Sequence, residues 1–272
     1  MQVADLGSVQ KTLLLPLWGR AVESRKPHPM LVDETAVRIA GEIGYDFSTI
    51  AAGMSPITQM AWVVRCVHTD RTVREFLARC PDATVVNLGC GLDTTFERVD
   101  NGRVRWFDLD LPDVIGLRRR FIHESERRRF LASSLLETSW LESVDRGRPM
   151  FFAALGVLYY IPEDRLRAFL KTIAGAIPAG ELLFDACSAT GLRIANQRVI
   201  RAGGMSESAA LVWSIEDARE LERWDERIGL MESYPLFRGM KHGRSLKQKW
   251  GMFMADTLRV MSMVRLRVGA GI

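Results

Sequence analysis

The segment 85-VVNLGCGLDTTF-96 joins an apolar run to a turn that contains two glycines. The apolar run over 83–89 is short, which is typical of a strand buried on both faces of a sheet. Gly89 and Gly91 then allow the backbone to turn tightly and to approach a ligand closely. A helix is expected to open with residues 94–99. Open parallel sheets bind nucleotides at such a strand–turn–helix junction.

The turn departs from the dinucleotide fingerprint at two positions. That fingerprint has a third glycine three residues after the second, and Thr94 occupies this position here. Asp93 adds a negative charge where a diphosphate would lie. Both features argue against NAD or FAD, so an NAD-dependent dehydrogenase is the least favoured reading. They suit a nucleoside ligand that carries no diphosphate.

The next predicted strand, over 104–112, ends in acids and a proline. An acid about 20 residues after the glycines can accept hydrogen bonds from both ribose hydroxyls. Asp108 and Asp110 both occupy this region, and spacing alone leaves both open.

Outward from this junction, strand and helix alternate along the chain. The patterns predict further strands over 129–135, 149–161 and 180–187, and helices over 113–129 and 162–177. This alternation predicts an α/β protein with a Rossmann-like, mostly parallel sheet and helices on both faces. The chain before residue 80 is helical in pattern, and Ser55 with Pro56 is typical of the start of a long helix. Residues 214–224 are expected to form a helix capped by Ser214.

The composition is that of an ordinary globular protein. Hydrophobic residues make up 47% of the 272 positions, and the longest apolar run, over 150–161, is too short to span a bilayer. We therefore expect a cytoplasmic protein without membrane or nucleic-acid partners; the sequence indicates no particular oligomeric state. The four cysteines and four histidines lack the spacing of a metal site, so no metal is predicted.

The positive charge is concentrated near the C-terminus. Residues 238–267 contain eight Lys or Arg and one acid. This surplus either attracts an acidic substrate or an anionic surface, or belongs to a solvated helix face followed by a charged edge strand.

Four segments in order resemble the leucine carboxyl methyltransferase family: VVNLGCGLDTTFERV, WFDLDLPDVIGLRRR, LASSLLETSW and GVLYYIPEDRL. The resemblance extends from about residue 12 to 240 and is most specific over 60–170. It implies a class I methyltransferase fold with a helical N-terminal cap, and S-adenosylmethionine as the cofactor. It implies one methyltransferase domain over 1–272, comprising a helical cap (1–80), a cofactor-binding core (81–187), a lid-like insert (188–213) and the end of the sheet (214–272).

The resemblance also implies roles for individual residues. Arg65 matches the arginine that grips the methionine carboxylate of the cofactor, and a guanidinium suits this task because it forms two parallel hydrogen bonds. Gly89 matches the glycine whose backbone meets the methionine end. Asp110 matches the ribose-binding acid and is preferred over Asp108 on this ground. Ser134 and Leu135 match the pair beside the adenine.

One position departs from the family pattern. Relatives usually have a Glu before Gly-Val-Leu, near the amino group of the cofactor, and this chain has Leu155. Loss of a charge-assisted contact costs about 1.5–3 kcal/mol. The change predicts weaker cofactor binding, a replacement acid such as Asp93, or loss of activity.

The leading prediction is an S-adenosylmethionine-dependent O-methyltransferase that acts on a carboxylate of a small molecule such as a polyketide-type metabolite. A carboxylate is already ionised at neutral pH and needs no general base. A phenol acceptor would need one, for which Tyr160, His123 and His242 are the weak candidates. The N-terminal helices and segment 188–213, with Trp18 and Trp213, are expected to select the acceptor. The alternatives are an inactive methyltransferase-fold scaffold, motivated by Leu155, and a protein C-terminal carboxyl methyltransferase.

Overall fold

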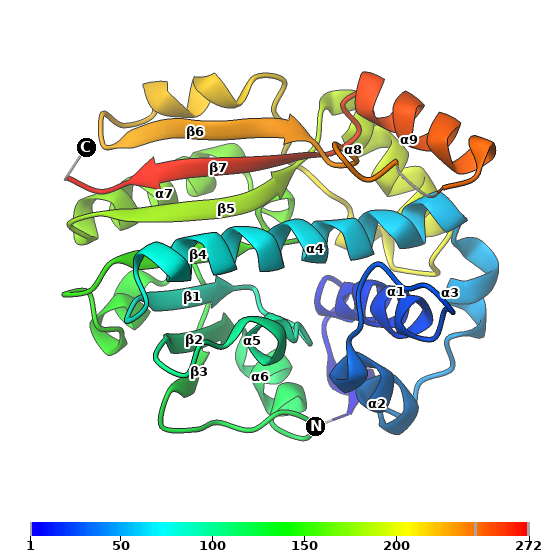
Figure 1. Ribbon diagram of the computed structural model, residues 1–272, viewed down its shortest axis with the longest axis horizontal. Coiled ribbons are helices and arrows are strands. Elements are labelled where there is room, and N and C mark those ends of the chain that lie inside the picture. The colour runs from blue at the N-terminus through cyan, green and yellow to red at the C-terminus, as the bar shows by residue number, and fades with distance from the viewer. Residues whose placement is uncertain (1, 242–243, 271–272) are drawn as a thin grey trace.

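A seven-stranded sheet forms the centre of the molecule (Figure 1). The computed structural model describes residues 2–241 and 244–270. The strand order is β3-β2-β1-β4-β5-β7-β6, and β7 runs opposite to the other six described strands. The mostly parallel sheet predicted from the sequence is therefore confirmed. The strands are β1 (Thr84–Leu88), β2 (Arg105–Asp110), β3 (Arg128–Ala132), β4 (Met150–Ala154), β5 (Gly180–Ala186), β6 (Ile228–Pro235) and β7 (Ser262–Val268).

Helices cover both faces of this sheet. The alternation of side chains along β1 divides its apolar residues between the two faces. Val85 packs in a cluster with residues of α4 (Pro56–Arg79) and α9 (Leu246–Thr257), whereas Val86 packs in a cluster with α7 (Glu163–Ala176). Two shorter helices, α5 (Thr95–Val99) and α6 (Pro112–Arg118), follow β1 and β2.

A helical cap lies beside the carboxyl ends of β1 and β2 (Figure 1). It comprises α1 (Leu14–Ser24), α2 (Glu34–Glu42) and α3 (Ser48–Gly53), preceded by the short turns Val3–Asp5 and Gln10–Leu13. Its apolar side chains share one cluster with α6, including Ile39 of α2 and Ile115 of α6. The cap therefore has no separate core and is held against the sheet domain.

A buried polar network joins the cap to the glycine turn. The Asp33 carboxylate accepts hydrogen bonds from Arg20 Nε and Arg98 Nη1, both at 2.9 Å, and from the Thr94 hydroxyl. Thr94 is the residue that replaces the third glycine of the dinucleotide fingerprint. Its side chain is fully buried and points at the cap rather than at a ligand. Residue 94 therefore links the turn to the cap.

Three local predictions were wrong. The helix predicted over 113–129 ends at Arg118, because this side chain turns inward to Asp108 and to the Gly91 carbonyl. The helix predicted over 214–224 is a short 3₁₀ turn, Ala218–Arg223, capped by Asp217 and not by Ser214. The basic strand at the C-terminus is not an edge strand, because β7 lies between β5 and β6 and its Arg265 pairs with Glu181 of β5.

The segment after β5 is largely helical. α8 (Ala189–Ala195) continues into a π-helical turn, Asn196–Arg201, and then a 3₁₀ turn, Glu207–Ala209. The remaining short helical turns are Thr138–Ser143 and Leu158–Tyr160. No helix among the described residues is long and apolar enough to span a bilayer.

Candidate cofactor and acceptor site

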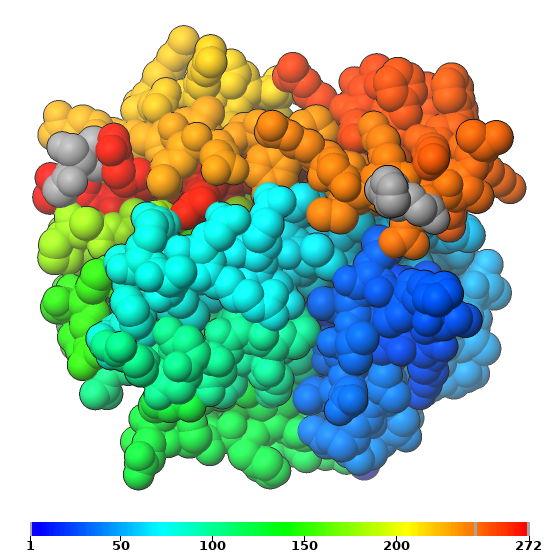
Figure 2. Space-filling model, in the orientation of Figure 1, coloured from blue at the N-terminus to red at the C-terminus, as the bar shows by residue number. Residues whose placement is uncertain are grey.

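A cavity of about 650 Å³ opens at the carboxyl ends of β1, β2 and β4. Its volume lies within the roughly 300–1,000 Å³ that is typical of small-molecule sites. The cap, α4, the end of α8 and α9 contribute the other walls. In Figure 2 the cap (blue), α4 (cyan) and the segment around α9 (orange) meet on one side of the molecule.

The glycine turn forms one wall of this cavity. Gly89 has φ +63° and Gly91 has φ +49°, a backbone region that side chains other than that of glycine rarely adopt. A Cβ atom on Gly89 would lie 2.6 Å from Val157 Cγ2. The sequence thus needs glycine at 89 both for the turn and for close packing against the loop after β4.

The structure places Asp110 and Asp108 in different environments. Asp110 lies on the cavity wall, where its carboxylate accepts the backbone N–H of Gly91 at 2.7 Å and that of Leu111 at 2.8 Å. Burial outweighs these bonds and raises the pKa of Asp110 to about 6. Asp108 is fully buried and pairs with Arg118 at 2.9 Å and Arg128 at 2.7 Å. Asp110 is therefore the acid that a ligand in this cavity can reach.

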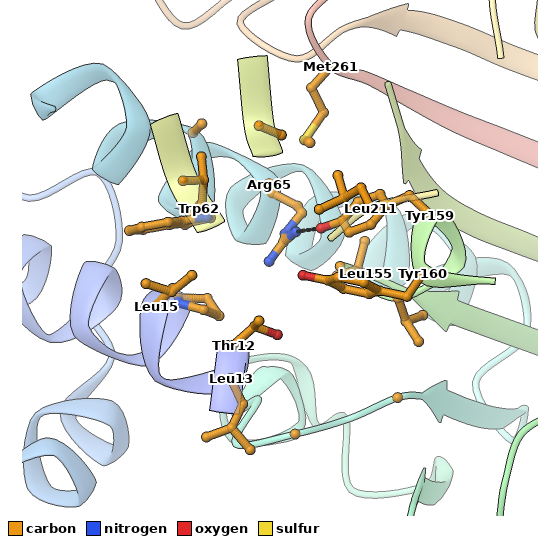
Figure 3. Close-up of a pocket in the computed structure, with 18 of the residues that line it drawn as sticks. Thr12, Leu13, Leu15, Trp62, Arg65, Leu155, Tyr159, Tyr160, Leu211 and Met261 are labelled. Carbon is orange, nitrogen blue, oxygen red and sulfur yellow. Dashed lines mark hydrogen bonds between the residues drawn. The ribbon is translucent and has the colours of Figure 1, made fainter. Parts of the chain in front are cut away.

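Arg65 points from the middle of α4 into the cavity, between Trp62 and Tyr159 (Figure 3). Its Nη1 donates to Asp185 Oδ2 at 2.9 Å and to the Tyr159 hydroxyl at 3.3 Å. Burial by itself would lower the pKa of this guanidinium, but the Asp185 carboxylate outweighs it and raises the pKa. Arg65 therefore keeps its charge, and its buried Nε has no hydrogen-bond partner among the described residues.

Asp93 lies on the cavity wall but is already engaged. Its carboxylate accepts hydrogen bonds from the Thr95 backbone N–H and hydroxyl, both at 3.0 Å, and from Asn87 Nδ2 at 3.1 Å. Burial tends to raise its pKa, but Arg98 and Arg20 outweigh this effect and lower the pKa to about 2. The bonds tie Asp93 to the start of α5, so this acid holds the turn in shape.

The other predicted contact residues also line the cavity. Ser134 and Leu135 follow β3, and Leu155 follows β4 directly. Leu155 presents an apolar side chain at the position where the family usually has a carboxylate. The structure thus brings together all eight of the predicted cofactor-binding residues: Arg65, Gly89, Gly91, Asp93, Asp110, Ser134, Leu135 and Leu155.

The predicted base candidates have different environments. Tyr160 points into the cavity opposite Thr12 (Figure 3). Burial outweighs its hydrogen bond with Thr12 and raises its pKa, so the phenol keeps its proton at neutral pH. His123 is exposed in the turn after α6 and lies off the cavity wall, while His242 falls outside the described residues.

The tryptophans expected at the acceptor site lie elsewhere. Trp213 is buried between Phe184 and Trp224, and Trp18 packs edge-on against Trp62. The tryptophans on the cavity wall are Trp62 of α4 and Trp250 of α9. No sequence signal distinguished Trp62 and Trp250 from core residues. Asp185, the partner of Arg65, was also not predicted, because its role depends on the packing of α4 against the sheet.

The strand order, the antiparallel β7 and the cavity at the strand ends together define a class I methyltransferase fold. A solved structure of a candidate methyltransferase from Thermobifida fusca agrees, with a TM-score of 0.60 over 97% of this chain and 95% of that one at 17% identity. Residues 14–174 match the leucine carboxyl methyltransferase family, and the chain belongs to this family.

Two relatives match a larger part of this chain than the family match over residues 14–174 does. The tetracenomycin polyketide synthesis O-methyltransferase TcmP of Streptomyces glaucescens is 35% identical over 84% of this chain and 85% of its own length. The S-adenosyl-L-methionine-dependent methyltransferase dpfgK of Gibberella zeae is 28% identical over the same shares. The predicted S-adenosylmethionine-dependent O-methyltransferase, with S-adenosylmethionine as its cofactor, is thereby confirmed.

The residues on the cavity wall fit this cofactor. A turn without room for a Cβ at Gly89, a wall acid and a charged arginine on the wall match a ligand with a ribose and an amino-acid tail. The arrangement also explains why a diphosphate is disfavoured, because Asp93 and Asp110 both flank the turn.

Proposed function

We propose that this protein methylates a carboxylate of an apolar small molecule. The observation that carries the proposal is the composition of the cavity. Beyond the cofactor residues, its walls are mainly apolar and aromatic, including Trp62, Leu211 and Trp250. Burial raises the pKa of both tyrosines on the cavity wall, Tyr159 and Tyr160, so both keep their protons. Such a wall suits an acceptor that arrives already ionised at its reacting group and is otherwise apolar.

In this proposal, the chain's own residues bind and orient the cofactor. Arg65 receives the methionine carboxylate, Asp110 accepts hydrogen bonds from the ribose hydroxyls, and Ser134 with Leu135 lies beside the adenine. The Gly89 backbone approaches the methionine end. When bound, the cofactor would supply an electrophilic methyl group for an acceptor oxygen, with its sulfur retaining the electrons of the C–S bond.

The remaining catalytic contribution is positioning of the acceptor. A carboxylate with a pKa near 4 is ionised at neutral pH, so no proton has to be removed before transfer. Apolar walls exclude water from the reacting oxygen and hold it in line with the methyl group. The Tyr160 hydroxyl, on this account, is a hydrogen-bond donor that helps to orient the acceptor rather than a base. TcmP, which acts in polyketide synthesis, supports an acceptor of this apolar type.

Calorimetric titration with S-adenosylhomocysteine tests the cofactor residues. Arg65→Ala and Asp110→Ala each remove a charge-assisted contact, so each is expected to weaken binding by at least about tenfold. Arg71→Ala is the matched control, because Arg71 is exposed on the same helix and pairs with Glu75. If both site variants bind S-adenosylhomocysteine as tightly as the parent protein, Arg65 and Asp110 are not cofactor-binding residues.

The acceptor class is tested with labelled S-adenosylmethionine and three panels: apolar aromatic carboxylic acids, the matching phenols, and peptides with a free C-terminal carboxylate. We expect label in the small carboxylic acids, as a base-labile methyl ester. Transfer only to phenols or only to peptides would overturn the carboxylate proposal for small molecules. Absence of transfer to any panel, with intact cofactor binding, would favour the inactive scaffold.

A further inference from the structure

The end of β4 lacks a carboxylate, but the adjacent end of β5 has one. Ala154, the last residue of β4, pairs with Phe184 of β5. Phe184 is followed by Asp185 within β5, whereas Ala154 is followed by Leu155 in the turn after β4. The side chain of Asp185 is fully buried. This chain therefore has a buried acid near the end of β5, next to the strand whose end is followed by the apolar Leu155.

Both oxygens of Asp185 are used. Oδ1 accepts the backbone N–H of Gly156 at 2.7 Å, and Oδ2 accepts Arg65 Nη1 at 2.9 Å. Gly156 has φ +75°, and a Cβ atom there would lie 2.9 Å from Arg65 Nη1. Only glycine therefore lets the loop after β4 and the guanidinium approach the same carboxylate. Asp185 joins α4, β4 and β5 at the methionine end of the cavity.

We infer that Asp185 is a positioning residue that holds Arg65 ready for the carboxylate of the cofactor. This inference rests on the proposed role of Arg65. Asp185 lies behind Arg65 as seen from the cavity and is not part of its wall. Its effect on the ligand is therefore transmitted through the guanidinium and not by direct contact.

The physical need for this residue follows from burial. An unpaired guanidinium in this environment would lose its hydration without compensation, which is strongly unfavourable. Asp185 compensates one edge of Arg65 through Nη1 and leaves Nε without a protein partner. A guanidinium that is fixed through Nη1 and lies on the cavity wall is prearranged for a second carboxylate that comes from the cavity.

Asp185→Asn tests the inference, because Asn keeps an acceptor for Gly156 and removes the charge that faces Arg65. The test compares two ligands by calorimetry: S-adenosylhomocysteine, which has the amino-acid tail, and 5′-methylthioadenosine, which lacks it. We expect the affinity for S-adenosylhomocysteine to fall by about tenfold or more, while the affinity for 5′-methylthioadenosine stays within about twofold. Asp185→Glu should recover part of the loss.

The control is Glu181→Gln, which removes another buried acid of β5. Glu181 pairs with Arg265 and Arg79 and lies off the cavity wall, so both ligands should bind its variant as they bind the parent protein. Equal losses for both ligands in Asp185→Asn would make Asp185 a purely structural residue and overturn the inference. Unchanged binding of both ligands would also overturn it. If the parent protein binds S-adenosylhomocysteine no more tightly than 5′-methylthioadenosine, the proposed role of Arg65 is wrong.

Discussion

Asp110 has a pKa of about 6 in the free protein, above the ordinary value, because it is buried. A carboxylate that accepts hydrogen bonds from ribose hydroxyls must be ionised, so ligand binding should lower this pKa. Affinity for S-adenosylhomocysteine is therefore expected to be constant above pH 7. It should decline as the pH falls through about 6, approaching about tenfold per pH unit for one linked proton.

The measurement is calorimetric titration between pH 5 and 8 in buffers of different ionisation enthalpy. Binding near pH 5.5 should release a proton, because the ligand favours the ionised carboxylate. Asp110→Asn should bind more weakly at pH 8 and should show a flatter pH profile. An affinity that is independent of pH over this range in the parent protein would exclude Asp110 as the ribose-binding acid.

At the scale of elements, the junction between the cap and α5 depends on Thr94. This hydroxyl donates to the buried Asp33 carboxylate, which also accepts from Arg20 and Arg98. Thr94→Val keeps the shape of the side chain and removes one of these donors. We expect the free energy of unfolding to fall by about 1–3 kcal/mol, the usual effect of an unmade hydrogen bond to a buried charged group.

Urea unfolding monitored by circular dichroism checks this value. Thr172→Val is the matched control, because Thr172 is exposed on α7 and its hydroxyl bonds only to the Ala168 carbonyl one turn away. The control should change the unfolding free energy by no more than about 0.5 kcal/mol. A Thr94 variant as stable as the control would mean that the network does not hold the cap.

The elements also show what the sequence could predict and what it could not. Strands such as β1 and β4 were predictable because central parallel strands are apolar on both faces, and the glycine turn located the cavity. The early end of α6 was not predictable, since Arg118 looks like a solvated helix residue until Asp108 and Gly91 are placed around it. Asp185 was missed for the same reason: its partner, Arg65, is distant in sequence, and only the packing of α4 against the sheet at β5 brings them together.

At the scale of the whole molecule, the cavity connects two regions of different chemistry. Asp110 at the sheet end and Arg65 of α4 provide polar groups, and these meet apolar side chains from elements far apart in the chain, namely the cap, α4 and α9. Helix α9 packs against α4 and lines the cavity through Trp250, Met254 and Ala255, none of which is a predicted cofactor-binding residue. Cofactor binding and acceptor selection should therefore be separable by substitution.

Trp250 is the residue at which this separation is tested most directly. It lines the cavity although its side chain is 65% exposed, so it lies at the rim and offers an aromatic surface to an incoming acceptor. Trp250→Ala should raise KM for an aromatic carboxylic acid by about tenfold, in line with the large apolar area a Trp buries, with little change in cofactor affinity.

Phe253→Ala is the control, because Phe253 packs against Trp250 on the same helix but lies off the cavity wall. Steady-state kinetics with the acceptor varied, paired with calorimetry for S-adenosylhomocysteine, measure both quantities. Equal acceptor KM values for the two variants and the parent protein would show that α9 takes no part in acceptor binding. A parallel loss of cofactor affinity in Trp250→Ala would show that the two regions of the cavity are coupled.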